Sequence, residues 1–123
     1  MNIINKYEIS FSNKILDFKT GNEIVKIVNV NNPILGEFLI GWFSAKEIDE
    51  LLLPDVDDAL SNPNAALENG SETVSIYIYY QTVKFHKDNI QGWAYELPTQ
   101  DFKEIVLLWR DFLLTPPLNG TRV

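Results

Sequence analysis

Apolar and polar positions alternate through much of the N-terminal third of the chain, in the period-2 pattern of β-strands with one solvated face. Tyr7, Ile9 and Phe11, for example, are separated by polar side chains. A β-branched run ends before Pro33, because proline cannot donate a hydrogen bond to a neighbouring strand. The pattern predicts strands over residues 7–12, 15–19, 23–31 and 37–43, with turns at 12–14 and 20–22.

A helix is predicted to begin at Ser44, because its hydroxyl can cap the helix and Glu47 follows three residues later. Pro54 should end or kink that helix, since proline removes a backbone hydrogen bond. Residues 55–71 are rich in Asp, Asn, Pro and Gly. We expect this stretch to form a long loop that holds one short helical turn at residues 56–60.

The second half of the chain predicts a long strand from Val74 that runs on through Phe85. A turn at residues 87–89 and a last strand over residues 91–96 follow. Thr99 then caps a C-terminal helix that ends at Pro116-Pro117. The apolar stripe of this helix consists of Phe102, Ile105, Val106, Trp109, Phe112 and Leu113.

These elements predict an α+β fold: a mainly antiparallel sheet of about five to six strands with a central helix. The amphipathic C-terminal helix should pack on one face of that sheet. The length, 123 residues, suits a single domain over residues 1–123, with residues 115–123 as a loose tail.

The aromatic residues fall into two groups. Trp42, Trp93 and Trp109 are each in phase with an apolar stripe, so we expect all three in the core. Tyr77 and Tyr79 lie on the strand face opposite its isoleucines. They either form a half-exposed face suited to a protein interface or lie in a second buried layer under the first helix, and the second arrangement is favoured.

Composition narrows the classes of function. The chain has 17 acidic and 10 basic residues, a formal charge of −7 and no Cys. An acidic protein is a poor match for nucleic-acid phosphates, and without Cys there is no disulfide, thiolate zinc site or Cys nucleophile. The sequence has neither a transmembrane stretch nor a secretory signal, so we expect a cytoplasmic protein that binds no membrane.

The negative charge is concentrated in one window. Between Ser44 and Glu72 there are eight acids and one base, a net charge of −7 that equals the charge of the whole protein. Such a patch favours encounter with a basic partner. The alternative is a solvated helix face followed by an exposed loop.

Catalytic and cofactor motifs are missing. His86 is the only histidine, the six glycines are scattered singly, and no Gly-x-Ser-x-Gly occurs. Asp55-Val56-Asp57-Asp58 begins like a calcium loop, but Leu60 stands where that loop needs glycine. We therefore expect no enzyme activity, no cofactor and no metal.

A resemblance enters through the C-terminal part of the sequence. The stretch WAYELPTQDF, residues 93–102, runs into Ile105, Trp109 and Phe112-Leu113. This strand-to-helix ending, in a small acidic chain without cysteine, resembles the bacterial immunity proteins of contact-dependent growth inhibition and related polymorphic toxin systems. The resemblance covers about a quarter of the chain and implies a cytoplasmic protein that binds one cognate toxin, often a nuclease.

We therefore predict an immunity protein whose acidic surface neutralises a basic nuclease toxin. The predicted partner-binding residues are the acids Glu47, Asp49, Glu50, Asp55, Asp57 and Asp58, with Tyr77 and Tyr79 as apolar anchors. The protein itself should be a monomer or a weak homodimer. The alternatives are an acidic interaction module, such as a chaperone or assembly subunit, and a small enzyme or ligand-binding domain.

Overall fold

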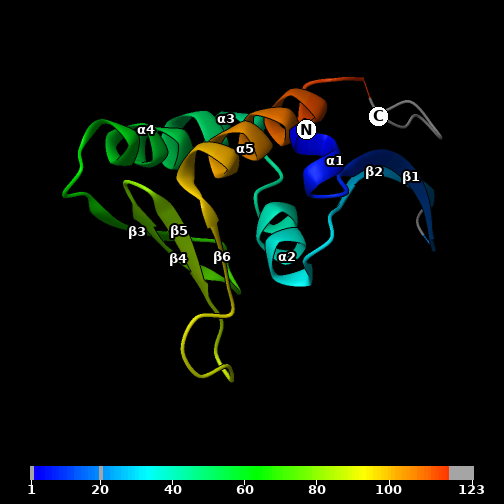
Figure 1. Ribbon diagram of the computed structural model, residues 1–123. Coiled ribbons are helices and arrows are strands. Elements are labelled where there is room, and N and C mark those ends of the chain that lie inside the picture. Colours follow the sequence, from blue (N-terminus) through cyan, green and yellow to red (C-terminus); the bar gives the residue numbers. More distant parts are fainter. Residues whose placement is uncertain (1, 20, 117–123) are drawn as a thin grey trace.

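The structure is a computed structural model that describes residues 2–19 and 21–116. It confirms the α+β class, with six antiparallel strands divided between a two-stranded and a four-stranded sheet. Figure 1 shows helices α4 and α5 lying across the four-stranded sheet, with α2 beside it and the two-stranded sheet at the opposite end of the molecule.

The two-stranded sheet is a long hairpin that follows the short helix α1 (Ile3–Lys6). Strand β1 (Ser10–Phe18) pairs with β2 (Gly21–Asn29) along its whole length. The predicted turn at residues 12–14 is therefore wrong, because β1 continues through it and the strands reverse only beyond Phe18. Gly21 has a φ of +129°, a conformation that favours glycine, at the point where β2 starts.

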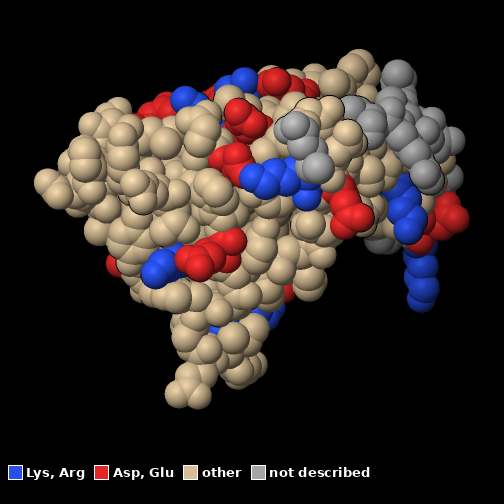
Figure 2. Space-filling view, in the orientation of Figure 1, with Lys and Arg blue, Asp and Glu red and all other residues tan. Residues whose placement is uncertain are grey.

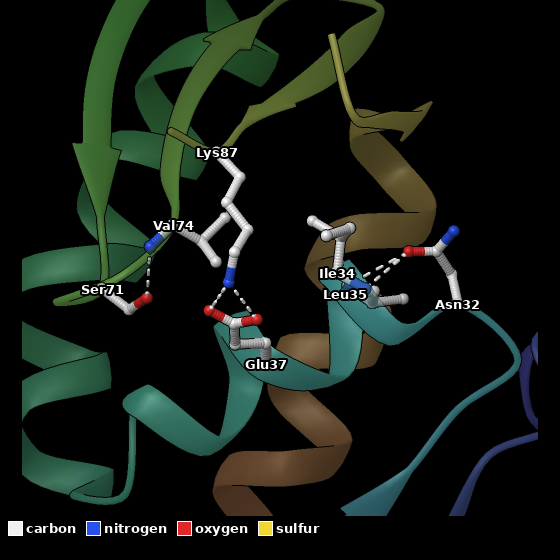
Figure 3. Close-up of polar contacts among 7 residues, drawn as sticks. All are labelled: Asn32, Ile34, Leu35, Glu37, Ser71, Val74 and Lys87. Carbon is white, nitrogen blue, oxygen red and sulfur yellow. Dashed lines mark hydrogen bonds and ion pairs between the residues drawn. The ribbon is translucent and has the colours of Figure 1, made fainter. Parts of the chain in front are cut away.

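Helix α2 (Pro33–Gly41) replaces the strand predicted over residues 37–43. The Asn32 side chain caps it by accepting hydrogen bonds from the backbone N–H groups of Ile34, at 2.9 Å, and Leu35, at 3.2 Å (Figure 3). Proline at the first helical turn loses no bond, since that N–H has no helical partner. Leu35, Phe38 and Leu39 are completely buried on one side of the helix.

A continuous helical segment follows, made of α3 (Ala45–Glu47), the π-helical turn η1 (Ile48–Leu52) and α4 (Leu53–Ser61). Ser44 caps it as predicted, accepting a hydrogen bond from the Glu47 N–H at 3.3 Å. The helical segment does not end at Pro54, which lies in the first turn of α4, directly after the π-helical turn. The predicted helical turn at residues 56–60 is part of α4, but the long loop predicted over residues 55–71 is wrong, because α4 and β3 (Ala66–Gly70) occupy most of it.

The four-stranded sheet has the order β3-β4-β5-β6, with β4 (Ser75–Tyr79), β5 (Thr82–His86) and β6 (Tyr95–Pro98). The long strand predicted from residue 74 to residue 85 is in fact β4 and β5, which form a hairpin. The last strand begins at Tyr95 and not at residue 91. The predicted turn at residues 87–89 is confirmed in position, and Asn89 there has a φ of +70°.

Helix α5 (Thr99–Leu113) packs on this sheet, as predicted. Its apolar stripe is buried, although Leu113 is only partly so. Thr99 does not act as the predicted cap: its hydroxyl is buried and donates a 2.6 Å hydrogen bond to the Tyr79 carbonyl. The helix ends at Leu113, before Pro116. Of the predicted tail, residues 117–123 lie outside the described residues.

The core joins the hairpin to the four-stranded sheet. Phe11 of β1 lies 5.8 Å from the Trp109 ring of α5 and 5.3 Å from the Phe112 ring. Phe38 of α2 contacts Phe85 of the sheet at 5.5 Å, edge to face. The helices therefore hold both sheets in one apolar cluster.

Candidate partner-binding surfaces

The six acids predicted to bind a partner all lie on the helical segment α3-η1-α4, and we call them the acidic segment. All are exposed except Asp55, which is half-buried. Figure 2 shows that acidic and basic side chains are interleaved along the upper edge of the molecule, where Figure 1 places α3, α4 and α5. The acidic segment is therefore partly balanced by neighbouring cations.

Helix α5 supplies two of those cations. Arg110 binds Asp49 at 3.0 Å, and Lys103 binds Asp57 at 2.7 Å. The hydrogen bonds to Asp49 and to Asp111 raise the pKa of Arg110. These two pairs attach α5 to the acidic segment, and each is partly exposed, so each contributes about 0–1 kcal/mol to stability.

Asp55 faces the sheet instead. The Asn69 side chain of β3 donates hydrogen bonds to the Asp55 carboxylate and to the Leu51 carbonyl, both at 2.9 Å. Among the described residues, Glu47, Glu50 and Asp58 have no cation within ion-pair distance. These three carboxylates are the part of the acidic segment whose charge is open to a partner.

Tyr77 and Tyr79 lie on the other side of the molecule. Helices α4 and α5 pack on the face of the sheet that carries Ile76, Ile78 and Phe85, all completely buried. The tyrosines are half-buried on the opposite face, so the favoured expectation of a second buried layer is wrong. We call this opposite side the outer face; it consists of Glu68, Tyr77, Tyr79, Lys84, His86 and Glu96, with Trp93 beside them.

Trp93 belongs to the outer face and not to the core. It is 46% exposed, whereas Trp42 and Trp109 are 8% and 1% exposed. Its ring lies 5.4 Å from that of Tyr77 at an interplanar angle of 64°, and 6.4 Å from that of His86. The sequence pattern misplaces Trp93 because it puts this residue in phase with a strand that in the structure begins two residues later, at Tyr95.

Two polar clusters elsewhere in the molecule have a structural role. Lys87, beyond the end of β5, pairs with the Glu37 carboxylate of α2, and the Ser71 hydroxyl accepts a hydrogen bond from the Val74 N–H at 3.2 Å (Figure 3). Hydrogen bonds from Lys87 and Thr73 lower the pKa of Glu37. The pair fastens α2 to the lower end of the sheet.

The second cluster holds α1 against α5. The Tyr7 hydroxyl donates a 2.6 Å hydrogen bond to Asp101, and Lys6 binds the same oxygen at 2.8 Å. Burial, followed by this hydrogen bond, raises the pKa of Tyr7. Burial alone would raise the pKa of Asp101, but the bonds from Lys6 and Tyr7 outweigh it and lower that pKa.

The described residues contain no cluster of three or more His, Asp or Glu side chains placed to hold a metal ion. The described helices also include none with the length and hydropathy needed to cross a membrane. No family model, no curated protein and no solved structure matches this chain.

Proposed function

We propose that this protein is an immunity protein that binds and neutralises a basic toxin, with a nuclease as the expected class. The observation that carries the proposal is the acidic segment: six acids within twelve residues, on a helical scaffold, of which only Asp49 and Asp57 have a cation partner among the described residues. A nuclease that binds nucleic acid presents a basic surface, which such a segment complements. The resemblance of residues 93–113 to immunity proteins supports the same role.

The first experiment expresses the open reading frame immediately upstream, with and without this protein, and counts surviving cells. We expect the neighbour to kill and co-expression to rescue. A neighbour that is harmless, or that kills equally in both cases, contradicts the proposal.

A second experiment tests the acidic segment itself. Reversing Glu47, Glu50 and Asp58 to Lys should slow association with the toxin by at least about tenfold and weaken its salt dependence. The matched control reverses three exposed acids elsewhere: Asp17, Glu23 and Asp88. Equal effects of both triple variants would show that net charge matters and the location of the acids does not.

The second candidate is an interaction module that forms homodimers. It is favoured by the exposed apolar side chain of Phe43, which is 75% exposed and lines a groove with Ile24, Val25 and Leu113. Light scattering of the purified protein without any toxin discriminates the two. A dimer that Phe43→Ser converts to a monomer supports this candidate.

A further inference from the structure

The outer face of the four-stranded sheet combines aromatic rings with carboxylates in a fixed order. The strand register places Glu68, Tyr77, Lys84 and Glu96 directly opposite one another in one row across all four strands. Carboxylates therefore stand at both ends of the row, with a ring and one cation between them. Since neighbouring strands are about 4.8 Å apart, the row of four residues is long enough to contact an extended peptide segment together with its side chains.

Two rings in and beside this row form a corner. Tyr77 and Trp93 meet at 64° with their centroids 5.4 Å apart. Interaction with the Glu68 carboxylate raises the pKa of Tyr77, and the strand register places that carboxylate directly opposite the tyrosine. A flat cation that enters the corner would meet ring faces and a carboxylate together.

The face already holds a cation of its own. The Lys84 Nζ lies 5.3 Å from the Trp93 centroid and 5.8 Å from that of Tyr79. Although Glu96 is directly opposite on the next strand, Lys84 forms no ion pair within the described residues. The rings of this face therefore stabilise a positive charge beside them, and the ammonium group of the protein's own Lys84 occupies that position.

We propose that the outer face binds an arginine-bearing segment of a protein partner. The guanidinium stacks on Trp93 and Tyr77 and pairs with Glu68, while the flexible Lys84 side chain moves aside. Arginine suits the site better than lysine, because its planar group both stacks on rings and donates paired hydrogen bonds to a carboxylate. The inference rests on the proposed function only in taking the partner to be a basic protein.

Charge complementarity decides between a protein and a nucleic acid as the occupant. Exposed bases could also stack on Trp93 and the tyrosines. However, Glu68 and Glu96 would repel the phosphates that flank each base, and Lys84 is the single Lys or Arg in the row. The same two carboxylates attract a guanidinium.

The site can be tested without the natural partner, because Trp93 is the one half-exposed tryptophan and reports on the face selectively. The probe is the blocked peptide Gly-Arg-Gly-Arg-Gly, and its control carries citrulline, which is uncharged, in place of arginine. The arginine peptide should protect Trp93 from acrylamide quenching, and the citrulline peptide should not. Equal protection by both peptides, or tighter binding of an oligouridine than of the arginine peptide, overturns the proposal.

Lys84 provides the sharpest variant. Lys84→Met removes the internal competitor, so it should tighten binding of the arginine peptide by about 3- to 5-fold. Lys14→Met, on the exposed hairpin, makes the same change in charge and should leave binding unchanged. Unchanged or weaker binding in Lys84→Met contradicts the proposed cation position. Circular dichroism checks that each variant is folded.

A rescue assay separates this inference from the proposed function. If the wild-type protein protects cells from the toxin and the double variant Tyr77→Ala, Trp93→Ala no longer does, the outer face is part of the inhibitory surface. If the folded double variant protects as well as the wild type, the inference fails and the proposed function stands. If the wild type protects nothing, the proposed function fails, and the peptide measurement alone then decides the inference.

Discussion

Trp109 of α5 contacts both the end of α2 and the β1–β2 hairpin, so we expect its replacement to lower the free energy of unfolding. Its indole N–H donates a 2.8 Å hydrogen bond to the Trp42 carbonyl, in the connection between α2 and α3, and its ring packs against Phe11 and Phe112. Trp109→Phe leaves that buried carbonyl without a donor, which costs about 1–3 kcal/mol. Weakened aromatic packing adds about 0.5–1.5 kcal/mol. We expect a total loss of about 2–4 kcal/mol in the free energy of unfolding.

Trp42 provides a matched comparison. It is also buried, and its ring packs 6.3 Å from Phe38, but its own indole N–H has no hydrogen-bond partner in the described part of the chain. Trp42→Phe therefore removes an unsatisfied donor, and the gain offsets part of the lost packing. The same chemical change should cost about 1–2 kcal/mol less here than at Trp109.

Urea unfolding followed by circular dichroism measures both variants without depending on tryptophan fluorescence, and the two slopes must agree for the comparison to hold. A domain of this size is stable by about 5–15 kcal/mol, so both proteins should remain folded in water. If Trp42→Phe proves as costly as Trp109→Phe, the hydrogen bond to the Trp42 carbonyl does not stabilise the docking of α5, and the reasoning is refuted.

Three further predictions concern the links between the elements. Because Lys87 lowers the pKa of Glu37, the ion pair should stabilise the fold at pH values above 4.5, the ordinary pKa of the carboxyl group, and this stabilisation should be lost as the pH falls through the lower folded-state pKa. Urea titrations from pH 7 to pH 2 should therefore show the stability of Glu37→Gln converging with that of the wild type. An added Cβ at Gly41 would lie 2.6 Å from the Ser71 Cβ, so Gly41→Ala should lower the free energy of unfolding by about 1–3 kcal/mol. Adding Ser71→Gly to that variant should recover part of the loss, which a double-mutant cycle measures. Thr99→Val should cost about 1–3 kcal/mol in thermal unfolding, because it removes the hydroxyl of a buried residue that donates to the part-buried Tyr79 carbonyl of β4, whereas Thr99→Ser should cost less.

The α+β class could be predicted because the strongest patterns were long and consistent. The helical spacing of α5 and the alternation of buried isoleucines in β4 both appear in the structure. Local signals with two meanings were misread. Asn32-Pro33 stops a strand, but it also caps a helix. The spacing of Phe38, Ile40 and Trp42 fits a strand, whereas the spacing of Leu35, Phe38 and Leu39 is helical, and the structure follows the helical pattern.

Pro54, within the acidic segment, shows the same ambiguity. A proline ends the helix before it or begins the one after it, and only packing decides which. Here Val56 and Ala59 of α4 are completely buried, so burial of that face extends the helix through a segment rich in Asp. The π-helical turn η1 directly precedes α4, and the residue pattern did not predict it.

The candidate site was predictable in its residue types but not in its placement. The sequence predicts the acids as partner-binding residues and the tyrosines as apolar anchors beside them, whereas the sheet separates Tyr77 from the acidic segment. Which face a strand residue occupies follows from alternation, but which face the helices cover depends on contacts between distant segments, such as Phe38 with Phe85. Substitutions can therefore alter one surface without the other, and the set of substitutions that weakens the binding of a partner shows which side of the sheet that partner covers.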